Sequence, residues 1–175
     1  MKVDPSLVHR LFYPQVPLVM AAQHRGRVSA MPVVSYLSVS DVPPTIGVSC
    51  MAKGFTCRLA LKARCFSLSV LDRSHAGAMS SLATVSGAKV KDKLNEVGLA
   101  YAPGRRAKVP VLVDSVATIE CRLTSSRKMG DHLLLMARVE AAYASASFTD
   151  FWDYAKYSPL LYTGWKEGLT LFPGT

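Results

Sequence analysis

Residues 29–56 constrain the fold most, because they combine two β-rich runs with a proline corner. Residues 33–39 are dense in β-branched and aromatic side chains, with small hydroxyl residues between them. Asp41-Val42-Pro43-Pro44 ends this run, and residues 45–51 resume it. Such a pattern predicts two strands joined at a proline-containing turn.

A helix is predicted to begin directly after the second strand. Residues 58–63 favour a helix, and Thr56 precedes them as a natural N-cap. A helix start presents free N–H groups and a positive dipole end, and Lys53 adds a flexible cation. Together with the hydroxyls of Ser49 and Thr56, this junction suits a phosphate-bearing ligand. An ordinary helix cap and a solvated lysine explain the same residues, so both interpretations stay open at this level.

The length and composition of the chain favour one β-rich domain. It has 175 residues, of which 50% are hydrophobic, and this is enough for one complete core. We therefore expect residues 1–175 to form a single domain. No apolar run reaches the roughly 18 residues of a membrane helix, and Asp4 and Pro5 come too early for a signal peptide. These features predict a cytoplasmic protein with no membrane partner.

The cysteine and histidine residues do not follow the spacing of a metal site or of a CxxC pair. A chain without an export signal normally keeps its cysteines reduced, so we expect four thiols that are buried or adjoin a ligand. No metal is expected. The residues concerned are Cys50, Cys57, Cys65, Cys121, His9, His24, His75 and His132.

The net charge of +9, with a pI of about 9.6, is compatible with nucleic acids, membrane surfaces or anionic dinucleotides. Much of it lies in two loops, one with Arg25 and Arg27 and the other with Arg105, Arg106 and Lys108. Aromatic residues do not interleave with these cations as they do on a base-stacking surface. The pattern favours a solvated or cofactor-attracting surface, and nucleic acid is not expected as a partner.

The remaining segments predict short strands and helices. Glu120 and Glu140 fall in β-rich segments, where a carboxylate is usually outward-facing or ion-paired. An aromatic tail over about residues 148–175 must dock on a large surface, of this chain or of a partner. We expect a packing helix at 5–12, a strand at 16–23, a hairpin turn at 24–27, a strand at 65–71, helices at 74–85 and 92–97, a loop at 103–110, and strands at 116–124 and 132–144 with a flexible basic tip at 125–130 between them.

Several short motifs resemble the flavin reductase-like family, the FMN-binding split barrels. Ser35-Tyr36 is followed by Val42-Pro43-Pro44, by Ile46-Gly47-Val48-Ser49, and by a basic loop that ends in Thr56. In the order of the family come Asp92-Lys93-Leu94, Ile119-Glu120-Cys121 and Gly130-Asp131-His132. The similarity covers about residues 17–171. Asp92-Lys93-Leu94 is equally compatible with an ordinary exposed helical turn.

The resemblance implies a mainly β fold, a split β-barrel of Greek-key type with peripheral helices. It implies an NAD(P)H-dependent flavin oxidoreductase that transfers hydride from nicotinamide to flavin N5, and then electrons to free flavin or a protein acceptor. The alternative is a flavin-binding electron carrier that does not use NAD(P)H. FMN is the expected cofactor, with FAD possible, NADH or NADPH is the donor, and the assembly is a homodimer. The flavin carries the chemistry, so no catalytic residue is expected, in agreement with a chain that lacks GxSxG and HExxH motifs.

The resemblance also implies the binding residues. One set would line the flavin ring and a second would surround its phosphate, while His132 would contact the nicotinamide substrate. Ala30 stands where the family commonly has Asn, and Tyr36 where it has Trp, which puts one polar contact to the ring in doubt. The ring set is Val34, Ser35, Tyr36 and Leu37, and the phosphate set is Ser49, Cys50, Met51, Lys53, Phe55 and Thr56.

Overall fold

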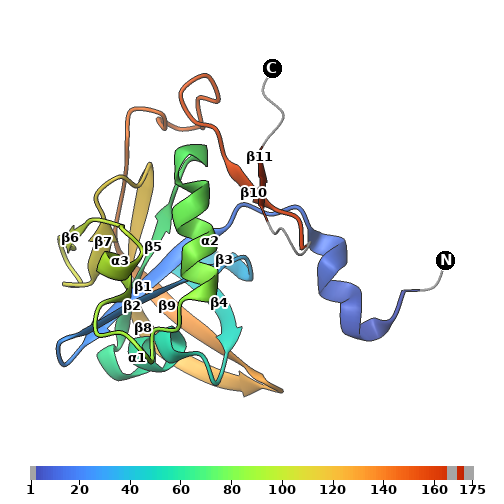
Figure 1. The fold of residues 1–175 in the computed structure, drawn as a ribbon, viewed down its shortest axis with the longest axis vertical. Coiled ribbons are helices and arrows are strands. Elements are labelled where there is room, and N and C mark those ends of the chain that lie inside the picture. The colour runs from blue at the N-terminus through green and yellow to red at the C-terminus, as the bar shows by residue number, and fades with distance from the viewer. Residues whose placement is uncertain (1–2, 165–168, 172–175) are drawn as a thin grey trace.

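A seven-stranded antiparallel sheet forms the centre of the computed structural model, which describes residues 3–164 and 169–171 (Figure 1). The order of its strands is β2-β1-β5-β8-β9-β4-β3. The mainly β fold predicted from the sequence is confirmed. The strands are β1 (Leu18–His24), β2 (Arg27–Val33), β3 (Tyr36–Asp41), β4 (Pro44–Met51), β5 (Cys65–Val70), β8 (Ala117–Met129) and β9 (His132–Ala144).

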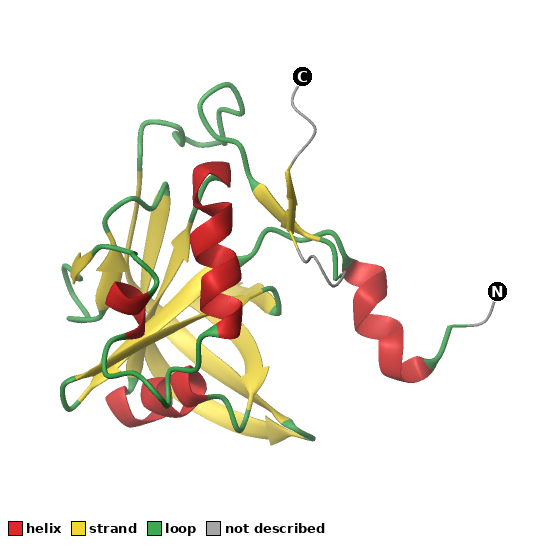
Figure 2. Ribbon diagram, viewed as in Figure 1, coloured by secondary structure: helices red, strands yellow, loops and turns green. Residues whose placement is uncertain are grey.

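Helices and two small hairpins surround this sheet (Figure 2). One hairpin pairs β6 (Tyr101–Pro103) with β7 (Pro110–Leu112), and the other pairs β10 (Leu160–Tyr162) with β11 (Leu169–Leu171). No helix in the described ranges is long and apolar enough to cross a membrane. The helices are η1 (Pro5–Phe12), α1 (Phe55–Ala63), η2 (Arg73–His75), α2 (Ala76–Thr84) and α3 (Lys93–Glu96).

The connection between β2 and β3 forces the sheet to roll up. These are the two edge strands, yet only Val34 and Ser35 separate them in the chain. From Val33 to Tyr36 an extended chain covers at most about 11 Å, whereas seven strands in a flat sheet would hold the two edges about 29 Å apart. The edges must therefore approach each other, and the barrel stays split because β2 and β3 do not pair in the sheet.

Strand β1 is buried on both faces because its alternate side chains enter different clusters. Leu18 and Met20 pack inside the barrel with residues of α1. Val19 and Ala21 pack on the other side, against α2 and α3. A strand covered on both faces needs an uninterrupted apolar run rather than alternation. This accounts for the sequence of β1, in which the first five residues are all buried.

Two expectations about peripheral segments are wrong, and an alternative left open for residues 92–94 is excluded. The hairpin of β8 and β9 has no flexible tip at 125–130, because β8 runs to Met129 and only Gly130 and Asp131 form the turn. Helix η1 forms, but none of its residues is buried, and it lies beside the barrel rather than packing on it (Figure 1). Lys93 and Leu94 are buried, so the segment that carries them is not an exposed helical turn.

The aromatic tail divides into a docked part and an exposed part. Tyr157 is buried in the barrel cluster, and the ring of Trp152 lies 4.4 Å from it between centroids. Phe151 and Tyr154 are 84% and 64% exposed. The tail residues Trp165 and Phe172 lie outside the described residues. Docking of the tail is thus confirmed for the rings of Trp152 and Tyr157.

Glu120 is fully buried, contrary to the expectation of an outward-facing or ion-paired carboxylate. Its two oxygens accept the N–H groups of Arg105, Arg106 and Ala107 at 2.6, 2.8 and 2.7 Å, and the Tyr143 hydroxyl at 3.3 Å. Burial by itself raises the pKa of Glu120, but these bonds outweigh it and hold that pKa below its ordinary value. The carboxylate thereby shapes the loop at 104–109.

Glu140, unlike Glu120, is ion-paired as the sequence predicts. Its carboxylate pairs with Arg122 at 3.3 Å and with Arg138 at 2.8 Å, and these two arginines are about half exposed. Surface pairs of this kind contribute little to stability. Glu140 is therefore a suitable control for Glu120.

We expect Glu120→Gln to lower the free energy of unfolding by about 3 kcal/mol, because an amide donor replaces an oxygen that accepts buried N–H groups. Urea titration at pH 7 measures the loss. The folded-state pKa of Glu120 is lowered, so its contribution is present above the unfolded pKa of about 4.3 and disappears as the pH falls through the lower folded value. The difference in free energy of unfolding between wild type and Glu120→Gln should therefore become smaller as the pH is lowered.

The matched change Glu140→Gln should cost less than about 1 kcal/mol. Equal losses for the two variants would contradict the structural role given to Glu120.

Candidate functional site

The connection between β2 and β3, Val34 and Ser35, is called the crossing below. It lies against the last part of β4. The N–H of Ser49 donates to the carbonyl of Ser35 at 2.8 Å, and Tyr36 stands opposite Val48 in the strand pair. The hydroxyl of Tyr36 donates to the carbonyl of Val16 at 2.7 Å. Burial raises the pKa of Tyr36, so this phenol remains a neutral donor. Ser35 of the predicted ring set therefore contacts Ser49 of the predicted phosphate set.

The ten predicted cofactor residues differ in their access to solvent. Ser35, Leu37, Met51 and Lys53 are exposed, whereas Cys50 and Thr56 are buried. The remaining four are partly buried: Val34, Tyr36, Ser49 and Phe55. They occupy the connection between β2 and β3, the start of β3, the end of β4, the turn after it and the first turn of α1, all within one stretch of chain. A ligand can reach the exposed members without any rearrangement of the sheet.

Thr56 does not cap α1, which corrects the sequence-based assignment. The N-cap is Gly54, which makes no side-chain hydrogen bond to the helix, and Thr56 lies inside the first turn. The helix starts early because the N–H of Gly54 closes a turn onto the carbonyl of Met51 at 2.8 Å. The first N–H groups of a helix have no acceptor within it, so this uncapped start can receive an anion.

The hydroxyl of Thr56 instead faces that of Ser29, with 2.8 Å between the two oxygens, and both residues are buried. Gly87 lies against this pair, because a Cβ at that position would collide with Ser29 Oγ and come within 3.1 Å of the Phe55 ring. Ser29 and Gly87 were not identified from the sequence as neighbours of the site. The sequence shows Gly87 only as a small residue after α2, which by itself does not indicate a close contact with the start of α1.

Arg27 connects the same helix start to the loop that follows α2. Its guanidinium lies 4.8 Å from the centre of the Phe55 ring. It also donates to the carbonyls of Gly87, Ala88 and Val90 at 2.9, 3.1 and 2.9 Å. These contacts hold the loop over the first turn of α1. Sequence analysis placed Arg27 in a basic loop but could not assign it this position.

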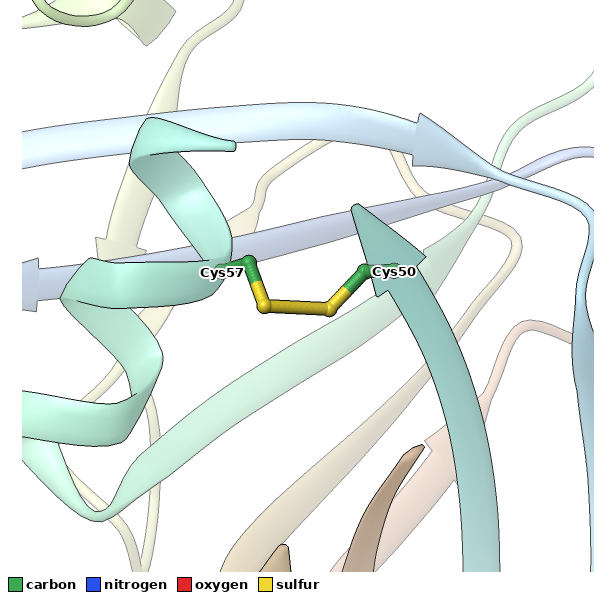
Figure 3. The surroundings of a disulfide bond; sticks show 2 residues. All are labelled: Cys50 and Cys57. Atoms are coloured by element: carbon green, nitrogen blue, oxygen red, sulfur yellow. A yellow bond between two sulfur atoms is a disulfide. The ribbon is translucent and has the colours of Figure 1, made fainter. Parts of the chain in front are cut away.

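Cys50 and Cys57 form a disulfide, which corrects the expectation of four reduced thiols (Figure 3). Cys50 is at the end of β4, and Cys57 is in the first turn of α1. Their Cα atoms are 6.3 Å apart, within the range that a disulfide spans. The turn at Met51 and Gly54 brings the two cysteines together, and a sequence separation of seven residues did not reveal it. Cys65 and Cys121 are free.

His132 lies beside the same end of β4. It is the strand partner of Met51, and the N–H of Ala52 donates to the carbonyl of Asp131 at 2.9 Å. The Nδ1 atom of His132 is 2.7 Å from the carboxylate of Asp131. This hydrogen bond lowers the pKa of Asp131. The second imidazole nitrogen of His132 can therefore meet a ligand while the first is held in place.

The Asp92-Lys93-Leu94 segment has a structural role. Asp92 caps α3 through the N–H of Asn95 at 3.1 Å, and it accepts the Tyr101 hydroxyl at 2.6 Å. That bond, with burial, raises the pKa of Tyr101 to about 12. Lys93 donates to the carbonyl of Leu82 at 2.7 Å, and burial lowers its pKa. In the part of the chain that the structure describes, His, Cys, Asp and Glu residues form no cluster that could hold a metal ion.

Comparisons with known proteins agree on one family. A family model described as "Flavin reductase like domain" matches residues 9–166. The NADH-dependent flavin reductase StyB of Pseudomonas fluorescens is 29% identical over 131 residues, which cover 75% of this chain and 72% of that protein. An uncharacterized protein of Aeropyrum pernix is 28% identical over 164 residues; the match spans 93% of this chain but only 62% of that protein.

A solved structure supports the same relationship. The FMN-binding protein from Thermus thermophilus, crystallised with bound p-hydroxybenzaldehyde, is 31% identical to this chain. It superposes with a TM-score of 0.82 and covers 98% of this chain and 92% of its own.

Reduction of the Cys50–Cys57 disulfide should lower the free energy of unfolding by about 2 kcal/mol, because the bond closes a short loop in the unfolded chain. Denaturant titrations with and without dithiothreitol measure this difference. Cys50→Ala/Cys57→Ala should be insensitive to the reductant, whereas Cys65→Ala should respond as wild type does. Identical titrations of the oxidised and reduced wild type would contradict a stabilising role.

Proposed function

The chain belongs to the flavin reductase-like family, and we propose that it binds FMN and acts as an NAD(P)H-dependent flavin oxidoreductase. The bound flavin would accept a hydride at N5 from nicotinamide C4 and pass electrons to free flavin or to a protein acceptor. The observation that carries the proposal is the junction of β4 and α1, where an uncapped helix start adjoins Lys53 and the Ser35–Ser49 contact. A cytoplasmic location, where nicotinamide dinucleotides are available, is part of the same proposal.

Two relatives support the choice of cofactor and donor. The Thermus thermophilus protein, 31% identical, is described as FMN-binding, and StyB is described as NADH-dependent. Transfer of both properties to this chain gives FMN as the flavin and NADH as the donor; FAD and NADPH are the alternatives. Both relatives are named for anionic ligands, FMN or NADH, so such a ligand is favoured over nucleic acid as the reason for the positive charge of this chain.

The residues at the junction suit a phosphate group. Lys53 is exposed and supplies a cation, and the first N–H groups of α1 supply donors. Ser29 and Thr56 share one hydrogen bond, so one of their two hydroxyl protons remains free for another acceptor. Cys50 is held in the disulfide and therefore has a packing role rather than that of a reactive thiol.

Residues at the crossing suit the flavin ring. Ser35 and Leu37 are exposed, and Val34 and Tyr36 are partly buried, so they offer a polar edge and an apolar wall to a planar ligand. The Ser49–Ser35 bond fixes the backbone there, which sets the direction of the neighbouring N–H groups. His132 would meet the nicotinamide at the end of β4, where Asp131 holds its ring.

We also propose a homodimer. Leu11 and Phe12 of η1 are 64% and 68% exposed, and Phe151 of the aromatic tail is 84% exposed. Exposed apolar side chains of this size are typical of protein interfaces. A single-chain mass from light scattering at micromolar concentration would contradict the dimer.

The test of the proposed function is anaerobic reduction of the FMN-loaded protein, followed by visible absorption. Bleaching of the bound flavin by NADH or NADPH is the expected outcome, and the more effective nucleotide identifies the donor. Bound flavin that neither nucleotide reduces would instead support the electron-carrier alternative. Failure to bind any flavin would exclude both functions.

Lys53→Ala should weaken FMN binding about tenfold, equivalent to about 1.4 kcal/mol, because it removes a charge-assisted contact to the phosphate. Riboflavin, which has no phosphate, should bind wild type and variant alike. Titration of flavin fluorescence measures both affinities. The matched control Lys62→Ala removes an exposed cation from the last turn of the same helix and should leave both unchanged. Equal weakening of FMN and riboflavin would place Lys53 away from the phosphate.

A further inference from the structure

The two basic loops singled out in the sequence meet in one pocket. Arg25 and Arg27 line it from the turn between β1 and β2, and Lys108 lines it from the loop at 104–109. Lys91 is a fourth cation on this lining. The pocket has a volume of about 820 Å³, a size that accommodates a cofactor-sized molecule. None of the ten residues predicted to bind flavin lines it.

The charges in this pocket are not neutralised by the protein. Within the described ranges, Arg25, Lys91 and Lys108 form no ion pair. Asp92 is the only carboxylate of the described lining, and it is already bonded to Tyr101 and Asn95. Four cations around one engaged carboxylate favour an anionic ligand.

Two of these cations lie on backbone that disfavours them. Arg25 has φ of 48° and Lys108 has φ of 50°, in the left-handed region that residues other than glycine rarely occupy. Arg25 precedes Gly26, with φ of 73°, in a two-residue turn where asparagine is the usual first residue. The Gln23 side chain donates to the carbonyl of Lys108 at 2.7 Å and holds the two loops together. Unfavourable backbone at two converging cations is typical of a functional site.

Arg27 contributes a separate observation. Among the side chains that the structure describes, its Nε is the buried nitrogen or oxygen without a hydrogen-bond partner. Because this atom is itself covered by the protein, Arg27 belongs to the fixed part of the lining, and the phosphates are left to Arg25, Lys91 and Lys108. The rest of the guanidinium is fixed by three carbonyls of the loop at 87–90.

We propose that this pocket binds the phosphates of a nucleoside diphosphate or of a similar nucleotide, as a second site separate from that of the flavin. The phosphates would contact Arg25, Lys91 and Lys108. Val28, Ala63 and the ring of Tyr101 provide apolar surface on the same lining, which suits the base and sugar. The inference does not rest on the proposed reductase activity, because none of the ten residues predicted to bind flavin lines this pocket.

The test is ADP binding by calorimetry, with the protein saturated with FMN so that the flavin site is closed to ADP. If the protein does not retain FMN, the same titration of the protein alone still tests the pocket. We expect one ADP per chain, an affinity that falls as salt is raised, and no comparable binding of adenosine. The double variant Arg25→Asn/Lys108→Asn should lower the affinity for ADP at least tenfold. Asparagine tolerates positive φ, so this variant should melt at or above the wild-type temperature.

A matched control removes the same charge elsewhere. Arg10→Gln/Arg73→Gln takes two exposed cations from η1 and η2 and should change ADP affinity less than twofold. If both double variants weakened ADP binding equally, the net charge of the protein would explain the loss, and the proposal would be overturned. ADP that competes with FMN, or adenosine that binds as tightly as ADP, would also overturn it. An oligonucleotide that binds at this pocket far more tightly than ADP would reassign the pocket to nucleic acid and overturn it too.

Discussion

The two-residue crossing between β2 and β3 is the constraint on which the rest of the structure depends. It joins the two edges of one sheet, so the sheet must curl into a barrel that stays open along that line. The same crossing carries Val34 and Ser35, and the hydrogen bond from Ser49 ties it to β4. A single covalent restriction thereby closes the sheet into a barrel and places Ser35 against Ser49, where the flavin is proposed to bind.

The two ends of the stretch at residues 29–56 are also brought together by packing. Ser29 at one end and Thr56 at the other share a buried hydrogen bond, and the disulfide fixes the start of α1 to the end of β4. Interior side chains of α1 complete the barrel core. The helix start is thus rigidly positioned, and a rigid donor set can bind an anion without paying to order itself.

A second polar constraint shapes the loop at 104–109. Glu120 gathers three N–H groups of the loop at 104–109, and Gln23 holds the carbonyl of Lys108. A buried carboxylate without these partners would be costly, so the loop and the carboxylate stabilise each other. One result is that Lys108 faces the same pocket as Arg25. Local sequence could not show this, because 83 positions of chain separate the two cations.

The sequence by itself determined the β-rich class, the positions of most strands, the proline turn and the helix after β4, because these follow from local periodicity and turn chemistry. Its motifs also indicated the family. Only the tertiary structure decided that Gly54 rather than Thr56 caps α1, that Cys50 pairs with Cys57, that Glu120 is buried and that the two basic loops converge. Each of these depends on how distant segments approach once the barrel closes, and that approach is set by packing and buried hydrogen bonds rather than by the order of residues along the chain.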